Sequence, residues 1–286
     1  MKVYKTYIKK ITAVVLVIAM CLTFAACGDT KESDEQEIEV TVFAAASLNT
    51  IMQEFKAEFE EENEGTTILI NADSSGALMN QIKEGAPCDL FFSAAQKQMN
   101  TLEEDGLIIT ESRRNVVNNK LVVITQLDSD TEVTGLETLG KAKSIALADG
   151  SVPVGKYTRQ ALMNLGILAE TDDPSAFTTQ EVSDALGGVE ISEQGNVSKV
   201  LTAVEEKASE VGTTYLSDTY GHEEGVRIIE EVPYDVAGDI IYPAALVVNK
   251  DATEVQSEMA ETFLEYITND AAKEKYIKYL FDPDVE

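Results

Sequence analysis

Residues 40–59, VTVFAAASLNTIMQEFKAEF, decide the fold class of this chain. The first four residues are apolar or β-branched, as in a buried strand. Further along, apolar side chains recur at spacings of three and four, at Leu48, Met52, Phe55 and Phe59, which predicts a helix. Ser47 lies at the turn between the two and is predicted to cap that helix. Such a junction brings unpaired backbone N–H groups and the positive end of a helix dipole to the end of a sheet, where they favour an anion.

Three more junctions of this kind follow, and together they are hard to explain as ordinary helix caps. The predicted strand 66–71 leads into a helix near Ser75. The predicted strand 144–148 leads into a helix near Val154, and a further helix begins at Val197. Each junction offers serine hydroxyls or free N–H groups, so the four together predict a shared anion site.

The rest of the chain also alternates between strands and helices. Strands are predicted at 87–92, 121–125, 211–216, 226–232 and 240–249, and helices at 96–104, 255–267 and 271–280. This order predicts an α/β fold with mainly parallel sheets. Ligands of such folds bind where strand ends and helix N-termini converge, often between two domains.

The N-terminus has the pattern of an export signal. Four lysines lie within the first ten residues, and residues 11–26 carry no charge but are too short for a permanent membrane span. The segment ends in FAAC, which resembles a bacterial lipoprotein signal whose cysteine, here Cys27, is acylated; Phe24 stands where Leu is usual. Residues 27–37 are polar and acidic, as in a flexible tether. We therefore expect residues 1–26 to be removed and the protein to be lipid-anchored outside the cell membrane.

The charge balance limits the possible partners. Removing residues 1–26 would remove four lysines and no acid, which leaves 18 basic against 51 acidic residues and a net charge of −33. This charge excludes nucleic acid and anionic lipid as partners. Exposed charges are screened within about 8–10 Å, so a closed cleft lined by N–H dipoles can still hold an anion. Cys88 would be the only other cysteine, so we expect no disulfide and a small buried residue there.

Two catalytic interpretations fail on single residues. The loop 150–156, GSVPVGK, matches the core of a phosphate-binding loop, but Tyr157 stands where a Mg²⁺-binding Ser or Thr is needed and Pro153 removes one N–H donor. His222 is the only histidine and lies in a polar segment, while no serine lies in a G-x-S-x-G elbow. A secreted hydrolase thus stays a remote alternative. Cys88 and His222 are also too few for a bare metal site.

Six motifs, in this order between about residues 40 and 281, resemble the periplasmic molybdate-binding proteins, the substrate-binding components of molybdate ABC transporters. They are FAAASL at 43–48, SSGAL at 74–78, GAPCDLF at 85–91, VPVG at 152–155, NV at 196–197 and TYLSD at 214–218. The resemblance implies a two-lobed periplasmic-binding-protein fold of type II, with one lobe at 38–119 plus 240–286 and the other at 120–239. It also implies no catalytic activity, no cofactor, a monomer, and a membrane permease as partner.

The resemblance further implies the ligand contacts. These are the hydroxyl and N–H groups of Ser47 and Ser75, the main-chain N–H groups of Val154 and Val197, and the Tyr215 hydroxyl. Val154 stands where the family usually has Ala, which could narrow the cleft, and Cys88 also replaces a usual Ala.

A site made only of donors suits a fully deprotonated tetrahedral dianion, which has acceptors only. Hydrogen phosphate would leave its O–H unpaired at a cost of about 1–3 kcal/mol, whereas sulfate differs from molybdate only in size and tungstate hardly at all. Asp73 and Asp149 lie close to two of the junctions, and either could accept a hydrogen bond from the O–H group of a protonated anion such as phosphate. Sulfate and phosphate therefore stay open as alternative ligands.

Overall fold

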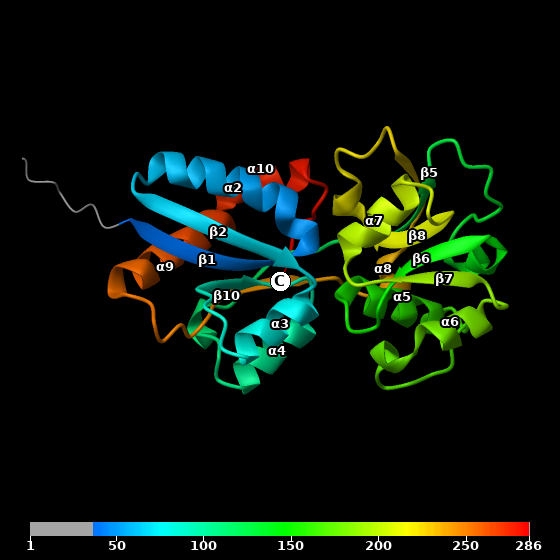
Figure 1. Cartoon of the computed structure of the whole chain (residues 1–286), viewed down its shortest axis with the longest axis horizontal. Coiled ribbons are helices and arrows are strands. Elements are labelled where there is room, and N and C mark those ends of the chain that lie inside the picture. The colour runs from blue at the N-terminus through cyan, green and yellow to red at the C-terminus, as the bar shows by residue number, and fades with distance from the viewer. Residues whose placement is uncertain (1–36, 286) are drawn as a thin grey trace, which may run out of the picture. The chain divides into compact units, whose positions relative to one another are not determined.

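The structure is a computed structural model that describes residues 37–285. The predicted signal 1–26, Cys27 and all but the last residue of the tether 27–37 lie outside these residues. Within them, strands and helices alternate along the chain (Figure 1). The strands are β1 (Ile38–Ala45), β2 (Thr66–Asp73), β3 (Leu90–Phe92), β4 (Arg114–Val117), β5 (Leu121–Gln126), β6 (Ser144–Ala148), β7 (Glu190–Gln194), β8 (Val211–Tyr215), β9 (Val226–Glu231) and β10 (Tyr242–Leu246). The α-helices are α2 (Asn49–Glu62), α3 (Ser75–Lys83), α4 (Gln96–Glu104), α5 (Pro153–Asn164), α6 (Thr179–Ala185), α7 (Val197–Glu205), α8 (Tyr234–Ala237), α9 (Glu254–Thr268) and α10 (Asp270–Lys278).

The first sheet has the strand order β2-β1-β3-β10-β4. β1 runs parallel to β2 and β3, whereas β10 runs antiparallel to β3 and β4. In the register of β1 and β2, Ala45 lies opposite Asp73. The junctions that follow these two strands therefore lie side by side at one edge of the sheet.

Helices cover both faces of the first sheet, as Figure 1 shows for α2 and α3 on opposite sides of β1. Val42 and Ala44 belong to a core cluster that includes Phe55 of α2 and side chains of α9 and α10. Phe43 points the other way, into a second cluster with Leu78 of α3 and side chains of α4. Burial on both faces explains why the second half of this strand, residues 42–45, is an unbroken apolar run rather than an alternating one.

The second sheet has the order β7-β6-β8-β5-β9. β6 runs parallel to β7 and β8, and β5 runs antiparallel to β8 and β9. Ala148 at the end of β6 lies opposite Gln194 at the end of β7. The junctions that lead into α5 and α7 are thus neighbours too, so each sheet contributes one pair of junctions.

The two-lobed α/β fold predicted from the sequence is confirmed, with one correction. The sheets are mixed rather than mainly parallel, because β10 and β5 each run against both of their neighbours. Each of these strands follows a segment in which the chain passes from one sheet to the other. Such a strand is not joined to its neighbour by a helical crossover, so it need not run parallel to that neighbour. The lobe boundaries at 119/120 and 239/240 stay a prediction. In residues 37–285, no helix is long and apolar enough to cross a membrane.

Candidate functional site

A small cavity lies where the junctions of both sheets meet. It is lined by Ala45, Ala46, Ser47, Ser74, Ser75, Ala94, Val152, Pro153, Val154, Val197 and Tyr215. All five residues that the sequence suggests as ligand contacts are therefore brought together. The volume open to the centre of a water-sized sphere is about 10 Å³, roughly that of one water site. A cavity of this size has no room for a sugar or an amino acid.

Ser47 lies at this cavity but does not cap a helix, contrary to the prediction. A 3₁₀ turn, Ala46–Leu48, stands between β1 and α2, so the N-cap position falls at Leu48, which makes no side-chain cap. The inserted turn delays the helix and leaves the serine hydroxyl for another partner. Ser47 Oγ lies 2.9 Å from the hydroxyl of Tyr242, the first residue of β10.

Ser74 and Ser75 have different hydrogen-bonding roles at the second junction. Ser74 is the N-cap of α3, and its hydroxyl accepts a hydrogen bond of 3.2 Å from the Ala77 N–H group. Ser75 is buried, and its Oγ accepts a hydrogen bond of 2.9 Å from the Ala94 N–H group. Because a backbone N–H already donates to this oxygen, the Ser75 hydroxyl proton is available to donate into the cavity.

The second sheet contributes two helix N-termini to the cavity. Val154 is the second residue of α5, and Val197 is the first residue of α7, behind an Asn196 cap whose Oδ1 accepts from the Lys199 N–H group at 3.0 Å. N–H groups in the first turn of a helix have no partner within that helix, so both valines offer main-chain donors. The turn into α5 requires glycine at position 155, since a Cβ there would lie 2.1 Å from the carbonyl oxygen of Asp149.

Tyr215, the last residue of β8, supplies a donor that has no protein partner. Its side chain is 1% exposed, and its hydroxyl makes no hydrogen bond to any of the described residues. Burial raises the pKa of Tyr215 well above its usual value, so the phenol keeps its proton. A buried polar group without a partner costs about 1–3 kcal/mol, and an anion in the cavity would remove that cost.

Arg159 on α5 occupies backbone hydrogen-bond acceptors in this region, a role that the sequence did not reveal. The side chain is fully buried, and its Nη1 donates to the carbonyl oxygens of Ala148 at 2.8 Å and Gly155 at 3.0 Å. These carbonyls belong to the junction between β6 and α5 and are thereby engaged by the guanidinium. A basic residue on an amphipathic helix is usually solvent-exposed, so its position in the sequence gives no signal of this role.

The two acids that kept phosphate open as a ligand are both engaged elsewhere. Asp149 Oδ1 accepts hydrogen bonds from the N–H and hydroxyl groups of Ser151, at 2.8 and 2.5 Å, which lower the pKa of this carboxyl. Asp73 Oδ1 accepts from the Ser74 N–H group at 2.7 Å and from Asn196 Nδ2 at 3.1 Å. The lining of the small cavity contains neither acid and no other carboxylate.

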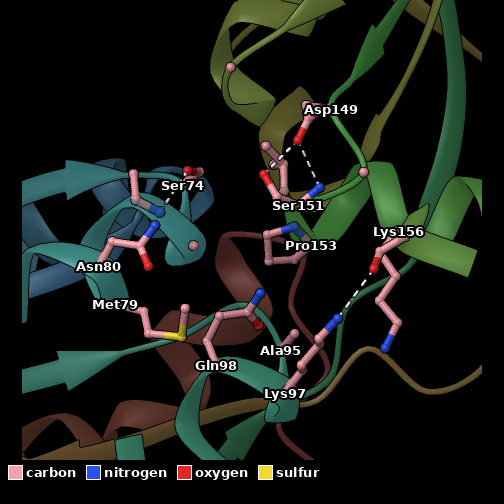
Figure 2. Close-up of a pocket in the computed structure, with 16 residues that line it drawn as sticks. Ser74, Met79, Asn80, Ala95, Lys97, Gln98, Asp149, Ser151, Pro153 and Lys156 are labelled. Carbon is pink, nitrogen blue, oxygen red and sulfur yellow. Dashed lines mark hydrogen bonds between the residues drawn. The ribbon is translucent and has the colours of Figure 1, made fainter. Parts of the chain in front are cut away.

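A larger, open pocket adjoins the small cavity and shares Ser74, Val152 and Pro153 with it (Figure 2). About 500 Å³ of this pocket is open to the centre of a water-sized sphere. Lys97 of α4 and Lys156 of α5 extend into it, and Lys97 Nζ donates to Ser175 Oγ at 3.2 Å. Burial, and then the charge of Lys97, lower the pKa of Lys156. Two cations therefore lie beside the small cavity, although Lys97 Nζ is also paired with Asp173 Oδ2 at 3.4 Å and Asp149 lines the same pocket.

The remaining candidate residues do not line the small cavity. Cys88 is buried as predicted; it donates to the Leu90 carbonyl, and burial raises the pKa of its thiol. His222 lies in the loop before β9, partly exposed, with Nδ1 3.1 Å from Glu205 Oε2. Within residues 37–285, no three His, Cys, Asp or Glu side chains are grouped so that they could hold a metal ion.

Comparisons with known proteins identify the family of this chain. Residues 40–282 match the family described as bacterial extracellular solute-binding protein. A Bacillus subtilis protein, YvgL, provisionally named as an ABC transporter substrate-binding lipoprotein, is 31% identical over 98% of both chains. The molybdate-binding protein ModA of Escherichia coli is 32% identical over 91% of this chain and 94% of its own. The structure of the Azotobacter vinelandii periplasmic molybdate-binding protein shares the fold, with a TM-score of 0.68 at 22% identity over 85% of this chain and 98% of that one.

Proposed function

Because this chain belongs to the bacterial extracellular solute-binding proteins, we propose that it captures molybdate outside the cytoplasm and delivers it to the permease of an ABC transporter. The family is one of solute-binding proteins and not of enzymes, which supports the cavity as a site of binding and release. Two relatives named as molybdate-binding proteins, from Escherichia coli and Haemophilus influenzae, support molybdate as the ligand.

The observation that carries this proposal is a cavity whose lining offers several hydrogen-bond donors and no carboxylate. The Tyr215 hydroxyl has no partner among residues 37–285, the Ser75 oxygen already accepts a hydrogen bond, and Val154 and Val197 present main-chain N–H groups. A tetrahedral dianion without a proton can accept from every one of these donors.

The same lining argues against hydrogen phosphate. Its O–H group would find no carboxylate in the cavity, because Asp73 and Asp149 are both bonded elsewhere. An unpaired donor costs about 1–3 kcal/mol, which is about a 5- to 150-fold loss of affinity. Sulfate is excluded only if its smaller size keeps it from reaching all donors at once. Tungstate has nearly the size and charge of molybdate, so we propose it as a second ligand of the same cavity.

Delivery to a permease follows from the placement of the donors. Ser47 and Ser75 lie next to strands of the first sheet, whereas Val154, Val197 and Tyr215 lie next to strands of the second. A bound anion therefore bridges the proposed lobes, 38–119 plus 240–286 and 120–239, and favours their closed arrangement through its higher affinity for that form. In this proposal the permease recognises the closed form of a monomer, which a lipid on Cys27 and the tether 27–37 hold at the outer face of the membrane.

Elemental analysis tests the ligand. The purified chain, mixed with equal concentrations of molybdate, hydrogen phosphate and sulfate and then freed of unbound ions by gel filtration, is expected to retain about one molybdenum per chain and no phosphorus. A Ser75→Ala variant serves as the control for binding at this cavity, and it should retain less molybdenum. Phosphorus in place of molybdenum, or neither element, contradicts the proposal.

A further inference from the structure

A chain of hydrogen bonds leads from the small cavity to both segments where the polypeptide passes between the sheets. Asn119 lies in the segment between β4 and β5, and Tyr242 begins β10. We propose that Asn119 and Tyr242 are positioning residues that fix the direction of the Ser47 O–H bond, so that Ser47 presents its proton to the bound anion. This inference rests on the proposed function, since it names the residues that select the anion at that cavity.

The orientation of the Asn119 amide is set by backbone donors. Its Oδ1 accepts a hydrogen bond of 2.9 Å from the Lys120 N–H group and lies 3.5 Å from the Ser217 nitrogen. A backbone N–H can only donate, so the oxygen of the amide must face these groups. The Nδ2 group then faces the other way, and its two hydrogens are directed to Ser217 Oγ at 2.8 Å and to the Tyr242 hydroxyl at 3.1 Å.

This orientation decides the direction of the next hydrogen bond. The Tyr242 oxygen accepts from Asn119, and its single proton has one remaining partner, Ser47 Oγ at 2.9 Å. The Tyr242 side chain is fully buried, which leaves no solvent to compete for that proton. Burial also raises the pKa of Tyr242 well above its usual value, so the phenol stays protonated. Tyr242 therefore donates to Ser47.

Ser47 is then left with one direction for its own proton. Its oxygen accepts from Tyr242, and its side chain lines the cavity. The hydroxyl proton points into the cavity, where only a ligand can accept it. The hydrogen bonds thus run in one direction, from Asn119 through Tyr242 and Ser47 to the anion.

Ser75 shows the same arrangement with a backbone donor in place of the tyrosine. The Ala94 N–H group donates to its oxygen, so both cavity serines have a buried donor behind them. The difference is that the donor behind Ser47 is a side chain and can be removed by substitution. Without it, the Ser47 hydroxyl is free to turn and to accept a hydrogen bond from a protonated anion such as hydrogen phosphate.

The substitution Tyr242→Phe tests this inference, because it removes the hydroxyl and keeps the ring. Calorimetric titrations with molybdate and hydrogen phosphate give two dissociation constants for each variant. We expect the molybdate constant to rise about tenfold and the preference for molybdate over hydrogen phosphate to fall by at least that factor. The matched control is Tyr276→Phe, at another fully buried tyrosine, whose hydroxyl donates to the Ile267 carbonyl at 3.0 Å away from the cavity. This control should lower the melting temperature and leave the preference unchanged.

A double-mutant cycle with Ser47→Ala separates positioning from a general structural role. If Tyr242 acts through Ser47, then Tyr242→Phe should have little further effect on either dissociation constant in the Ser47→Ala background. An equal loss in both backgrounds, or an unchanged anion preference in Tyr242→Phe alone, overturns the inference while leaving the proposed function intact. A wild-type protein that prefers another tetrahedral anion overturns the proposed ligand, and the same cycle, measured with that anion, still decides the role of Tyr242. A wild-type protein that binds no anion overturns both.

Discussion

Replacing Tyr215 with phenylalanine should weaken ligand binding without weakening the fold. The Tyr215 hydroxyl is buried in the cavity wall and has no partner among the described residues. Its only hydrogen bond would be to the bound anion, and a hydrogen bond to a charged group contributes about 1.5–3 kcal/mol. Losing it should raise the dissociation constant for molybdate about 10- to 200-fold. The ligand-free protein loses no hydrogen bond, so its free energy of unfolding should stay the same or rise.

Two measurements on the Tyr215→Phe variant check that affinity falls while the free energy of unfolding does not. Isothermal titration calorimetry gives the dissociation constant, and urea unfolding of the ligand-free protein gives the free energy of unfolding. Tyr276→Phe again provides the contrast: its hydroxyl is bonded to Ile267, so unfolding should become easier by about 1 kcal/mol while affinity is kept. Unchanged affinity in Tyr215→Phe would remove Tyr215 from the site. A clear loss of stability in that variant would show that its hydroxyl has a partner within the protein.

Three further predictions concern pH, association rate and packing. Burial raises the pKa of Asp218 to about 7. The stability that this carboxyl contributes is therefore present below about pH 4 and is lost as the pH rises through 7. The gain in the free energy of unfolding caused by Asp218→Asn, measured by urea unfolding of the ligand-free protein, should thus be larger at pH 7.5 than at pH 4, by at most about 4 kcal/mol, and an equal gain at both pH values would contradict this. Changing both Lys97 and Lys156 to Gln should slow molybdate association in stopped-flow experiments at low salt, because the two lysines attract the anion. The effect should fade at high salt and be absent in the exposed control Lys143→Gln. Equal association rates in the double variant and the wild type would exclude this electrostatic attraction. Gly155→Ala should destabilise the protein by about 1–3 kcal/mol or more, because its Cβ would meet the Asp149 carbonyl oxygen at 2.1 Å, and unaltered stability would show that this turn can relax.

The sequence predicted those parts of the fold and the candidate site that depend on local patterns. The strand 144–148 and the helix 96–104 have the predicted bounds, because apolar runs and helical spacing report burial directly. Three strand–helix junctions and the start of the helix at Val197 were found for the same reason. The ligand contacts came from the motifs of the molybdate-binding family, and their meeting in one cavity is a result of the structure.

Features that depend on distant parts of the chain were not predictable in this way. β7, with the sequence EISEQ, was missed because none of its residues is fully buried and the segment lacks an apolar run. The 3₁₀ turn at Ser47 has no local signature, so the serine was wrongly assigned as a helix cap. The contact between Ser47 and Tyr242 joins residues 195 positions apart, and no spacing rule connects them.

The most direct test of the donor-only cavity is a calorimetric titration of the ligand-free protein with molybdate and, separately, with hydrogen phosphate, at one pH and one ionic strength. We predict binding of one molybdate per chain and binding of hydrogen phosphate at least several-fold weaker, since the phosphate O–H finds no carboxylate in the lining of the cavity. Hydrogen phosphate binding as tightly as molybdate, or more tightly, would contradict the account.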